Sequence, residues 1–200
     1  LGNDLVGTNY TGSSVAISSD GTIVAVGESG YDSNKGRVHV YQYNDSSSSW
    51  SQLGSDLDGG NTGDQGGFSV ALSSDGTIVA MGESYHDSSK GRVRVYQYNN
   101  NSWVQLGNDL VGQAFDEYVG SSVALSDDAV ILSLGVPGYD SDKGTIRMYQ
   151  YDNCSNSWVQ LGNDTDMVGD ENNRIANHGT RLSLSSDGTR VVAPSFYHNG

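Results

Sequence analysis

Three loops of the chain carry the residues whose types and spacing could bind a ligand. Each loop places an aromatic or imidazole ring directly before an aspartate and ends in Lys-Gly. A ring that stacks on a ligand and a carboxylate that accepts hydrogen bonds would suit recognition of a sugar or a protein. The alternative is that Asp and Ser serve here as turn residues. The six residues are Tyr31, Asp32, His86, Asp87, Tyr139 and Asp140.

A second group of polar residues could hold calcium, which prefers carboxylate and carbonyl oxygens as ligands. The glycine-rich segment 56–67 crowds four such side chains, but their spacing does not match an EF-hand loop. A solvated acidic rim is the alternative. The shorter motif Ser-Ser-Asp-Gly-Thr offers a single carboxylate, so we interpret it as a tight hairpin turn. The candidate calcium ligands are Asp56, Asp58, Asn61 and Asp64.

Catalytic chemistry has little support in the sequence. The four histidines stand at unrelated positions, and the chain contains no G-x-S-x-G, H-E-x-x-H or P-loop motif. We therefore expect no enzyme, no catalytic residues and no certain cofactor besides possible calcium. A glycosidase that uses two carboxylates stays open, because only folded distances could identify such a pair.

Five N-x-[ST] sequons indicate where the protein would act. Such asparagines accept N-linked glycans in secreted proteins. Three of the five fall in the same polar turn of a repeated unit, an exposed place where a glycan would not disturb a sheet. We expect N-linked glycans and an extracellular or cell-surface location; chance in an Asn- and Ser-rich chain is the alternative. The asparagines are Asn9, Asn44, Asn100, Asn153 and Asn163.

Cys154 is the only cysteine and lies inside one of these sequons. A single cysteine cannot form an internal disulfide. In a secreted protein, an exposed thiol suggests a disulfide to another chain or to a part of the chain outside this sequence. A solitary residue without a partner is the alternative.

The composition limits the kinds of partner. The chain has 10 Lys and Arg against 24 Asp and Glu, a formal net charge of −14. Nucleic acid is excluded as a partner, because phosphate binding needs clustered basic residues. No apolar run is long enough to span a bilayer, so no membrane insertion is expected. Residues 1–12 show no signal-peptide pattern, as expected of mature numbering or of an excerpt from a longer chain.

The elements that must position these loops repeat along the chain. The motif Leu-Gly-x-Asp-Leu and its variants begin at Leu1, Leu53, Leu106 and Leu161, at spacings of 52, 53 and 55 residues. A unit of this length is typical of a β-propeller blade and is longer than an ankyrin or tetratricopeptide repeat. The many Tyr, Trp and β-branched residues argue against disorder.

One unit contains the pattern of four antiparallel strands. Residues 69–82 predict a hairpin around Ser-Asp-Gly, a third strand follows at Arg92 to Tyr98, and a fourth begins at Trp103. The second strand is apolar at consecutive positions, which indicates that both of its faces are buried, as in a propeller. Tyr96 or Tyr98 could pack on Trp103 across a hairpin.

The predicted fold class is all-β, a β-propeller of four-stranded antiparallel blades in a segment of a six- or seven-bladed ring. We divide the single domain 1–200 into the last strand of a preceding blade with its linker, three blades, and the first half of a further blade. The corresponding ranges are 1–12, 13–58, 68–111, 120–165 and 179–200.

The motif Gly67-Phe68, the hairpin after it and the later Gly-x-Val-x-Val-Tyr strand resemble the FG-GAP repeat of integrin α-type propellers. Val136-Pro137 keeps the proline of the repeat's exit. The resemblance implies a secreted or cell-surface protein. The loops here lack the longer Asp-rich segment of the calcium-binding members, and the kelch propeller is the nearest rival.

From these patterns we expect a non-enzymatic interaction or structural module of a cell surface, matrix or filament. Its expected partners are other extracellular proteins, copies of itself, or glycans. The alternative is a carbohydrate-binding lectin or a glycan-active enzyme built on a propeller.

Overall fold

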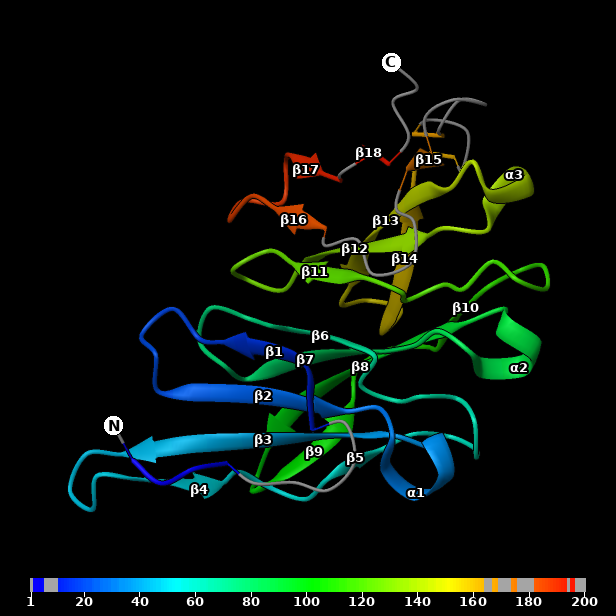
Figure 1. Ribbon diagram of the computed structural model, residues 1–200. Helices are drawn as coiled ribbons and strands as arrows, with labels where there is room; N and C mark the ends of the chain where they lie inside the picture. The colour runs from blue at the N-terminus through cyan, green and yellow to red at the C-terminus, as the bar shows by residue number, and fades with distance from the viewer. Residues whose placement is uncertain are drawn as a thin grey trace.

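Three antiparallel sheets follow one another along the chain and stack side by side (Figure 1). The computed structural model describes residues 2–5, 11–163, 167–168, 174–175, 182–193 and 195–196. The first blade contains β1 (Thr11–Ile17), β2 (Ile23–Glu28), β3 (Arg37–Asn44), β4 (Ser49–Gln52) and β5 (Leu57–Asp58), which pairs with β3. The second contains β6 (Ser69–Leu72), β7 (Ile78–Glu83), β8 (Arg92–Asn99), β9 (Ser102–Gln105) and β10 (Leu110–Val111), which pairs with β8.

The third blade contains β11 (Val123–Leu125), β12 (Ile131–Val136), β13 (Thr145–Asp152) and β14 (Ser157–Leu161). Two short strand pairs lie beyond it, β15 (Arg174–Ile175) with β18 (Ser195–Phe196), and β16 (Ser183–Leu184) with β17 (Val191–Val192). The hairpin of β16 and β17 repeats the Ser-Ser-Asp-Gly-Thr turn of the earlier blades. The predicted β-propeller of four-stranded antiparallel blades is confirmed.

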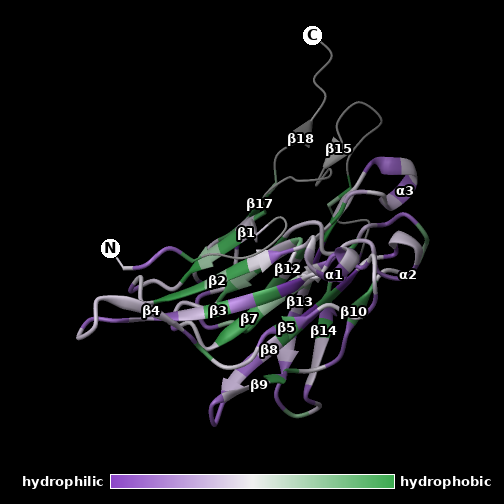
Figure 2. Cartoon of the chain, turned by 60° about the horizontal axis from the view of Figure 1, so that its bottom comes forward, coloured by the Kyte–Doolittle hydropathy of each residue, from purple (hydrophilic) through white to green (hydrophobic). Residues whose placement is uncertain are grey.

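Successive residues of the inner strands enter two different cores, which explains the unbroken apolar runs. Ile78 and Ala80 pack toward the third blade, whereas Val79 and Met81 pack toward the first. Side chains alternate between the faces of a strand, so a strand between two sheets must be apolar at every position. In Figure 2 the hydrophobic colour follows β1, β2 and β7, whereas α3 is hydrophilic.

We call the side of each blade that meets the blade before it in sequence the leading face, and the opposite side the trailing face. The trailing face of the first blade presents Ile23, Ala25 and Val40 to Val70 and Met81 on the leading face of the second. The second and third blades meet through the equivalent residues.

The predicted packing of tyrosine on tryptophan across the outer hairpin is confirmed. The ring centroids of Tyr98 and Trp103 lie 5.1 Å apart. The tryptophan also bonds to the neighbouring blade, because its Nε1 donates to the carbonyl of Leu53 at 2.8 Å. Trp158 donates to Leu106 in the same way, at 3.0 Å. Each of these two tryptophans therefore joins two blades.

The Ser-Ser-Asp-Gly-Thr motifs form tight turns at one end of the blades, which we call the hairpin face. Ser18 donates its hydroxyl to Asp20 at 2.7 Å, and the amide of Thr22 donates to the same carboxylate oxygen at 2.9 Å. These bonds, from Ser18 first, hold the pKa of Asp20 below its ordinary value. The motif forms the tight hairpin turn that the sequence predicts, and its own aspartate closes the turn.

The loops that carry the candidate ligand residues lie at the opposite end, which we call the upper face. Each contains a one-turn helical segment, namely α1 (Tyr31–Asn34), α2 (His86–Ser89) and α3 (Tyr139–Asp142), and the three lie on the same side of the stack (Figure 1). Asp32, Asp87 and Asp140 have φ between 45° and 46°, so the chain turns in the left-handed region, which aspartate tolerates. Among the described residues, none of these helical segments is long and apolar enough to cross a membrane.

Candidate functional site

The upper end of the second blade is closed by a buried network of charges. Glu83, fully buried at the end of β7, accepts hydrogen bonds from Arg92 at 2.6 Å and from the amide of Gly60 at 3.1 Å. Its other oxygen accepts from Arg94. Burial lowers the pKa of Arg92, but the hydrogen bond and charge of Glu83 outweigh this and raise it. Glu83 thus ties two strands and an inter-blade loop together.

Asp64, Glu83 and His86 form a group that could hold a metal ion, since their ligand atoms lie within 4.8 Å of one another. His86 Nδ1 lies 2.9 Å from Asp64 Oδ2. The guanidinium of Arg92 lies 3.6 Å from Asp64 Oδ2 and 2.6 Å from Glu83 Oε2. A cation therefore already stands between these carboxylates, and we interpret the group as an ion network that joins two blades.

The first blade has the same arrangement with a histidine in place of the second arginine. Glu28, fully buried, accepts from Arg37 at 2.7 Å and lies 3.2 Å from His39 Nε2. The other ring nitrogen of His39 lies 2.8 Å from Asp56 Oδ1. Both ring nitrogens therefore face carboxylates.

In the third blade a different residue supplies the buried carboxylate. Val136 stands where the other blades have a buried glutamate, and Arg147 stands where the second has Arg94. Glu117, in the inter-blade loop, supplies the carboxylate instead. It accepts hydrogen bonds from Arg147 at 3.0 and 3.1 Å and from the amide of Gln113 at 2.7 Å. Gln113 and Gly60 are equivalent, so Glu117 makes both kinds of bond that Glu83 makes.

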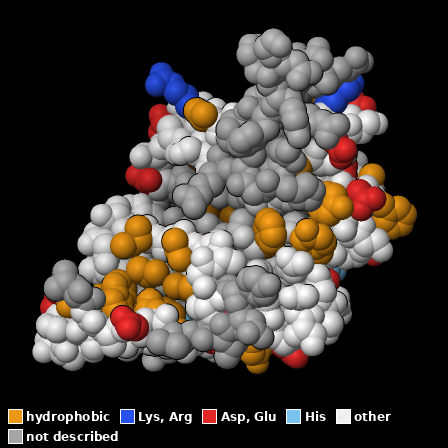
Figure 3. Space-filling model, viewed as in Figure 1, with side chains coloured by type: hydrophobic (Ala, Val, Ile, Leu, Met, Phe, Trp, Pro, Cys, Tyr) orange, Lys and Arg blue, Asp and Glu red, His pale blue; other side chains and the backbone are white. Residues whose placement is uncertain are grey.

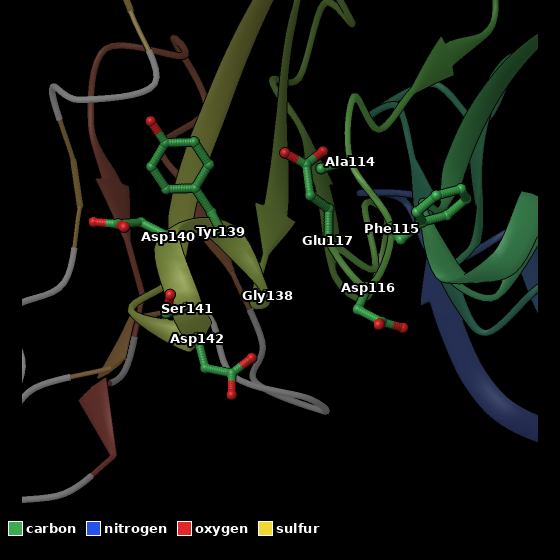
Figure 4. A pocket seen from close by; sticks show the side chains of 9 residues that line it. All are labelled: Ala114, Phe115, Asp116, Glu117, Gly138, Tyr139, Asp140, Ser141 and Asp142. Carbon is green, nitrogen blue, oxygen red and sulfur yellow. The ribbon is translucent and has the colours of Figure 1, made fainter.

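A hollow of about 560 Å³ lies at the upper end of the third blade, where Glu117 replaces the strand glutamate. Gly138 stands where the second blade has Tyr85, and its amide donates to the carbonyl of Glu117 at 3.2 Å. In Figure 4 the side chains of Asp116 and Asp142 extend to the same side below Gly138, whereas the ring of Tyr139 and the carboxylate of Glu117 extend to the other. The lining residues are Ala114, Phe115, Asp116, Glu117, Gly138, Tyr139, Asp140, Ser141 and Asp142.

The candidate ligand residues are therefore not equivalent once folded. Tyr139 and Asp140 line the hollow. Tyr31 is covered by the guanidinium of Arg37, 3.6 Å from the ring centroid, and His86 is bound to Asp64. Asp87 and Asp140 each pair with the lysine three residues later, at 2.7 and 2.9 Å. Asp32 is exposed in α1.

A second hollow, of about 440 Å³, lies at the inner strands. Serine hydroxyls and a few apolar side chains line it, where the first strands of the three blades begin. Ser14 and Ser69 use their hydroxyls to bond the carbonyls of Gly67 and Gly120 in the next blade, at 2.8 and 2.7 Å. These serines join the blades.

The four proposed calcium ligands have different neighbours. Asp56 bonds to Arg37 and His39, and Asp58 lies 3.6 Å from Lys35. The backbone amide of Asn61 donates to Asp64 at 2.9 Å. The structure brings Asn61 and Asp64 together, and it places Asp56 and Asp58 with basic groups. Calcium binding stays a prediction.

The sequons that the structure describes are all exposed. Asn44, Asn100 and Asn153 lie at the outer hairpins and Asn163 follows β14, while Asn9 lies outside the described residues. Asn100 has φ 48°, as in a tight turn. Cys154 is an exposed free thiol. Glycosylation and an intermolecular disulfide stay predictions.

The sequence analysis missed the residues that build the upper face. It named Asp116 and Glu117 only as counterparts of the candidate calcium ligands, and it did not identify Glu28, Glu83, Arg92 or Arg147. A signal was present, since Arg37, Arg92 and Arg94 alternate with buried valines directly after Lys-Gly, and a glutamate ends the apolar run of β2 and of β7. Charged residues inside apolar strands indicate paired buried charges.

The comparisons with known proteins support the propeller. A family described as "Domain of unknown function (DUF5122) beta-propeller" matches residues 73–102. No curated protein matches the chain. Among solved structures, the periplasmic gluconolactonase PpgL of Pseudomonas aeruginosa has a TM-score of 0.59 at 18% identity, over 94% of this chain and 54% of its own. A proposed 6-phosphogluconolactonase of Bacteroides uniformis has 0.59 at 12%, over 90% and 46%.

TolB of Acinetobacter baumannii is also similar, with a TM-score of 0.52 at 15% identity, over 92% of this chain and 38% of its own. The chain thus spans about half the length, or less, of these three proteins. At such low identities the similarity shows the fold alone. The FG-GAP type of propeller is not confirmed by these comparisons.

The expectation of a non-enzymatic interaction or structural module is corrected by the same comparisons. Two of the three similar structures carry the names of lactonases, a gluconolactonase and a proposed 6-phosphogluconolactonase, which are enzymes. The findings agree better with the alternative, a propeller that binds or acts on carbohydrate. The prediction was wrong because it used short motifs within single loops. Such motifs carry no signal for a hollow that forms only when neighbouring loops fold together.

Proposed function

We propose that this chain is the carbohydrate-binding part of a propeller protein and that the sugar lies in the hollow of the third blade. The observation that carries the proposal is the hollow of about 560 Å³ between α3 and the inter-blade loop. Its size lies within the range of small-molecule sites, roughly 300 to 1,000 Å³. The equivalent place in the second blade is closed by His86 and Asp64.

The lining suits a sugar that carries no negative charge. Carboxylates accept hydrogen bonds from pairs of hydroxyl groups, and Asp116 and Asp142 reach the same side of the hollow (Figure 4). On the other side of Gly138, Tyr139 offers an aromatic ring of the kind that packs on the apolar face of a sugar. The basic groups near the lining are paired: Arg147 bonds to Glu117 and Lys143 to Asp140. Lys90, 5.1 Å from the ring of Phe115, bonds to Asp87. The lining therefore favours neutral sugars over phosphorylated ones.

Ligand-observed NMR with the intact protein tests the proposal. Saturation transfer to glucose, N-acetylglucosamine or gluconolactone is expected, together with weaker transfer to gluconate. Replacing Asp116 by Asn or Tyr139 by Ala should weaken binding by about tenfold, which corresponds to roughly 1.4 kcal/mol. Tyr31→Ala, in the equivalent turn of the first blade, is the matched control and should leave binding unchanged. Transfer that is absent, or equal in all variants, contradicts the proposal.

Hydrolysis of a sugar lactone is the second candidate, favoured by the names of two similar structures. Asp116 or Asp142 would then act as a general base on water, the role that a positioned carboxylate can take. The same NMR samples report it, because gluconolactone would open to gluconate faster than in buffer alone. A rate equal to the buffer rate leaves binding as the function.

The place of action that we propose is outside the cytoplasm. The exposed sequons and one similar protein named as periplasmic support it. Mass spectrometry of the native protein before and after removal of N-glycans tests it. A glycan on Asn44, Asn100 or Asn153 would establish passage through a secretory compartment. If these asparagines are unmodified, the sequons do not support a location outside the cytoplasm.

A further inference from the structure

Three aromatic rings from separate segments meet at the upper face of the second blade. We call Phe68, Tyr85 and Tyr118 the aromatic row. The ring centroids of Phe68 and Tyr85 lie 6.1 Å apart, and those of Tyr85 and Tyr118 lie 5.6 Å apart, both in edge-to-face contact. Tyr85 is 37% exposed, so solvent reaches the row. In Figure 3, hydrophobic side chains come to the surface between the places that α2 and α3 take in Figure 1.

The repeat does not need these rings for its own packing. The other copies have glycine, serine or glutamine at the three positions and still form the same strands and loops. The equivalents are Gly30 and Gly138 for Tyr85, Gln65 for Tyr118, and Ser13 and Ser121 for Phe68. Aromatic residues that gather on loops at one place of the surface, where the fold does not require them, indicate a binding surface.

The backbone at Tyr118 supports a role in binding. Its φ of 53° lies in the left-handed region, which bulky residues rarely adopt. Gln65, at the equivalent position of the preceding inter-blade loop, has φ 56°, so the conformation belongs to the repeat. A tyrosine in this conformation is strained, and residues held under such strain gather at ligand sites. The loop thus holds an aromatic ring at a position that disfavours one.

One end of the aromatic row is continuous with the hollow of the third blade. Tyr118 directly follows Asp116 and Glu117, which line that hollow. Burial, and after it the charge and hydrogen bond of Asp116, raise the pKa of the Tyr118 hydroxyl, while a hydrogen bond with Ser89 opposes them. At the other end of the row, Phe68 lines the second hollow. The row therefore forms an aromatic path between the two hollows.

We propose that the ligand is an oligosaccharide of neutral sugars, with one unit in the hollow of the third blade and further units on the aromatic row. The inference rests on the proposed function, which it extends from a single sugar to a chain. The first unit bonds to the carboxylates of the hollow, and the next units lay their apolar faces against Tyr118 and Tyr85. Hydroxyl groups of the chain donate to Asp116 near one end of the row and bond to the serines of the second hollow at the other.

A proline-rich peptide is the other kind of ligand that packs on rows of aromatic rings. Such a peptide offers carbonyl acceptors and few donors, because proline has no amide hydrogen. A carboxylate only accepts hydrogen bonds, and Asp116 stands at the end of the row that enters the hollow. The lysine near this loop, Lys90, bonds to Asp87. A sugar chain, with many hydroxyl donors, therefore fits these groups better than a proline-rich peptide.

Titration calorimetry with the intact protein tests the inference. The probes are glucose and N-acetylglucosamine, each compared with its β-1,4-linked dimer, trimer and tetramer. Affinity should rise by about tenfold or more from the monomer to the tetramer, because the units that pack on the rings strengthen binding. Monomer binding without any rise with length overturns the inference and leaves the proposed function standing. The absence of binding by every probe overturns both.

Substitutions taken from the repeat itself identify the surface that binds the chain. Tyr85→Gly introduces the residue of the other two blades, and the backbone accepts it, since φ is −102° at Tyr85 and −87° and −85° at Gly30 and Gly138. It should remove most of the rise with length, whereas Tyr85→Phe should keep the rise. Tyr118→Gln, which introduces the residue of the preceding loop, is the second variant and should also remove it. Tyr31→Ala, in the first blade, is the matched control.

The ratio of tetramer to monomer affinity is the readout, because a loss of folded protein lowers the apparent binding of both probes alike. An unchanged ratio in both Tyr85→Gly and Tyr118→Gln overturns the inference, and so does an equal fall of the ratio in Tyr31→Ala. A polyproline peptide that binds more tightly than either tetramer, and that responds to the same two substitutions, would identify a peptide as the occupant and overturn our choice.

Discussion

The second and third blades each have an arginine at the same position near the upper face, Arg94 and Arg147. Its carboxylate partner comes from a different element in each blade. In the second blade the carboxylate comes from β7, as Glu83, and the inter-blade loop contributes Asp64 to His86. In the third, β12 ends in Val136, and Glu117 of the loop bonds to Arg147 and to the amide of Gln113. The negative charge has moved from the strand to the loop.

The difference shows how a repeat can form a hollow without losing its internal ion pair. A buried arginine needs a carboxylate, because an unpaired buried charge is strongly destabilising. A glutamate in the loop is one methylene longer than Asp64, which lets it reach the arginine and frees the strand position for valine. With Tyr139 in place of His86 and Gly138 in place of Tyr85, the third blade has a hollow where the second has a histidine bound to an aspartate.

The largest expected effect comes from giving the second blade the strand residue of the third. Glu83→Val removes the carboxylate that Arg92 and Arg94 share and leaves the amide of Gly60 without its acceptor. Breaking a buried ion pair from one side costs about 3 kcal/mol or more. Urea unfolding followed by tryptophan fluorescence measures the loss.

Val104→Ala, at an exposed position of the same blade, is the control and should change the free energy of unfolding by less than about 0.5 kcal/mol. A loss below about 1 kcal/mol for Glu83→Val would mean that Glu83 behaves as a surface charge, and the comparison of the two blades would fail.

A second substitution sharpens the comparison. In the Glu83→Val background, Asp64→Glu supplies the longer loop carboxylate that the third blade uses. The new side chain should reach Arg94 and the amide of Gly60, as Glu117 reaches Arg147 and Gln113. We expect recovery of about 1 to 2 kcal/mol, whereas Asp64→Glu alone should be neutral or destabilising. A double-mutant cycle measures the coupling, and additive effects would contradict an exchange of roles.

The repeat and the strands were predictable because they depend on patterns within one unit. The period set by Leu1, Leu53 and Leu106, and the apolar run of β7, follow from each blade lying between two others. The site was not predictable in this way. Whether Tyr139 lines a hollow depends on Glu117 and Gly138, whose effect appears only when the inter-blade loop folds onto α3.

The smallest effect concerns the hairpin face, where the aspartate of the turn serves the same role in every blade. Ser185, first, and then Thr189 donate to Asp187 and lower its pKa to about 2. In the third blade Val130 replaces the threonine, so Asp128 loses one hydroxyl donor, and its pKa is lowered by Ser126 and the amide of Val130.

Because the pKa of Asp187 is lower in the folded protein, its contribution to stability is present above the unfolded value of about 4 and is lost as the pH falls toward 2. Titration of the aspartate carboxyl carbons by NMR should show Asp187 protonating at a lower pH than Asp128. Thr189→Val should raise the midpoint of Asp187 toward that of Asp128, since it removes the hydroxyl that the third blade lacks. Equal midpoints before the substitution would show that the hydroxyl contributes nothing, and the blades would then differ at their upper ends alone.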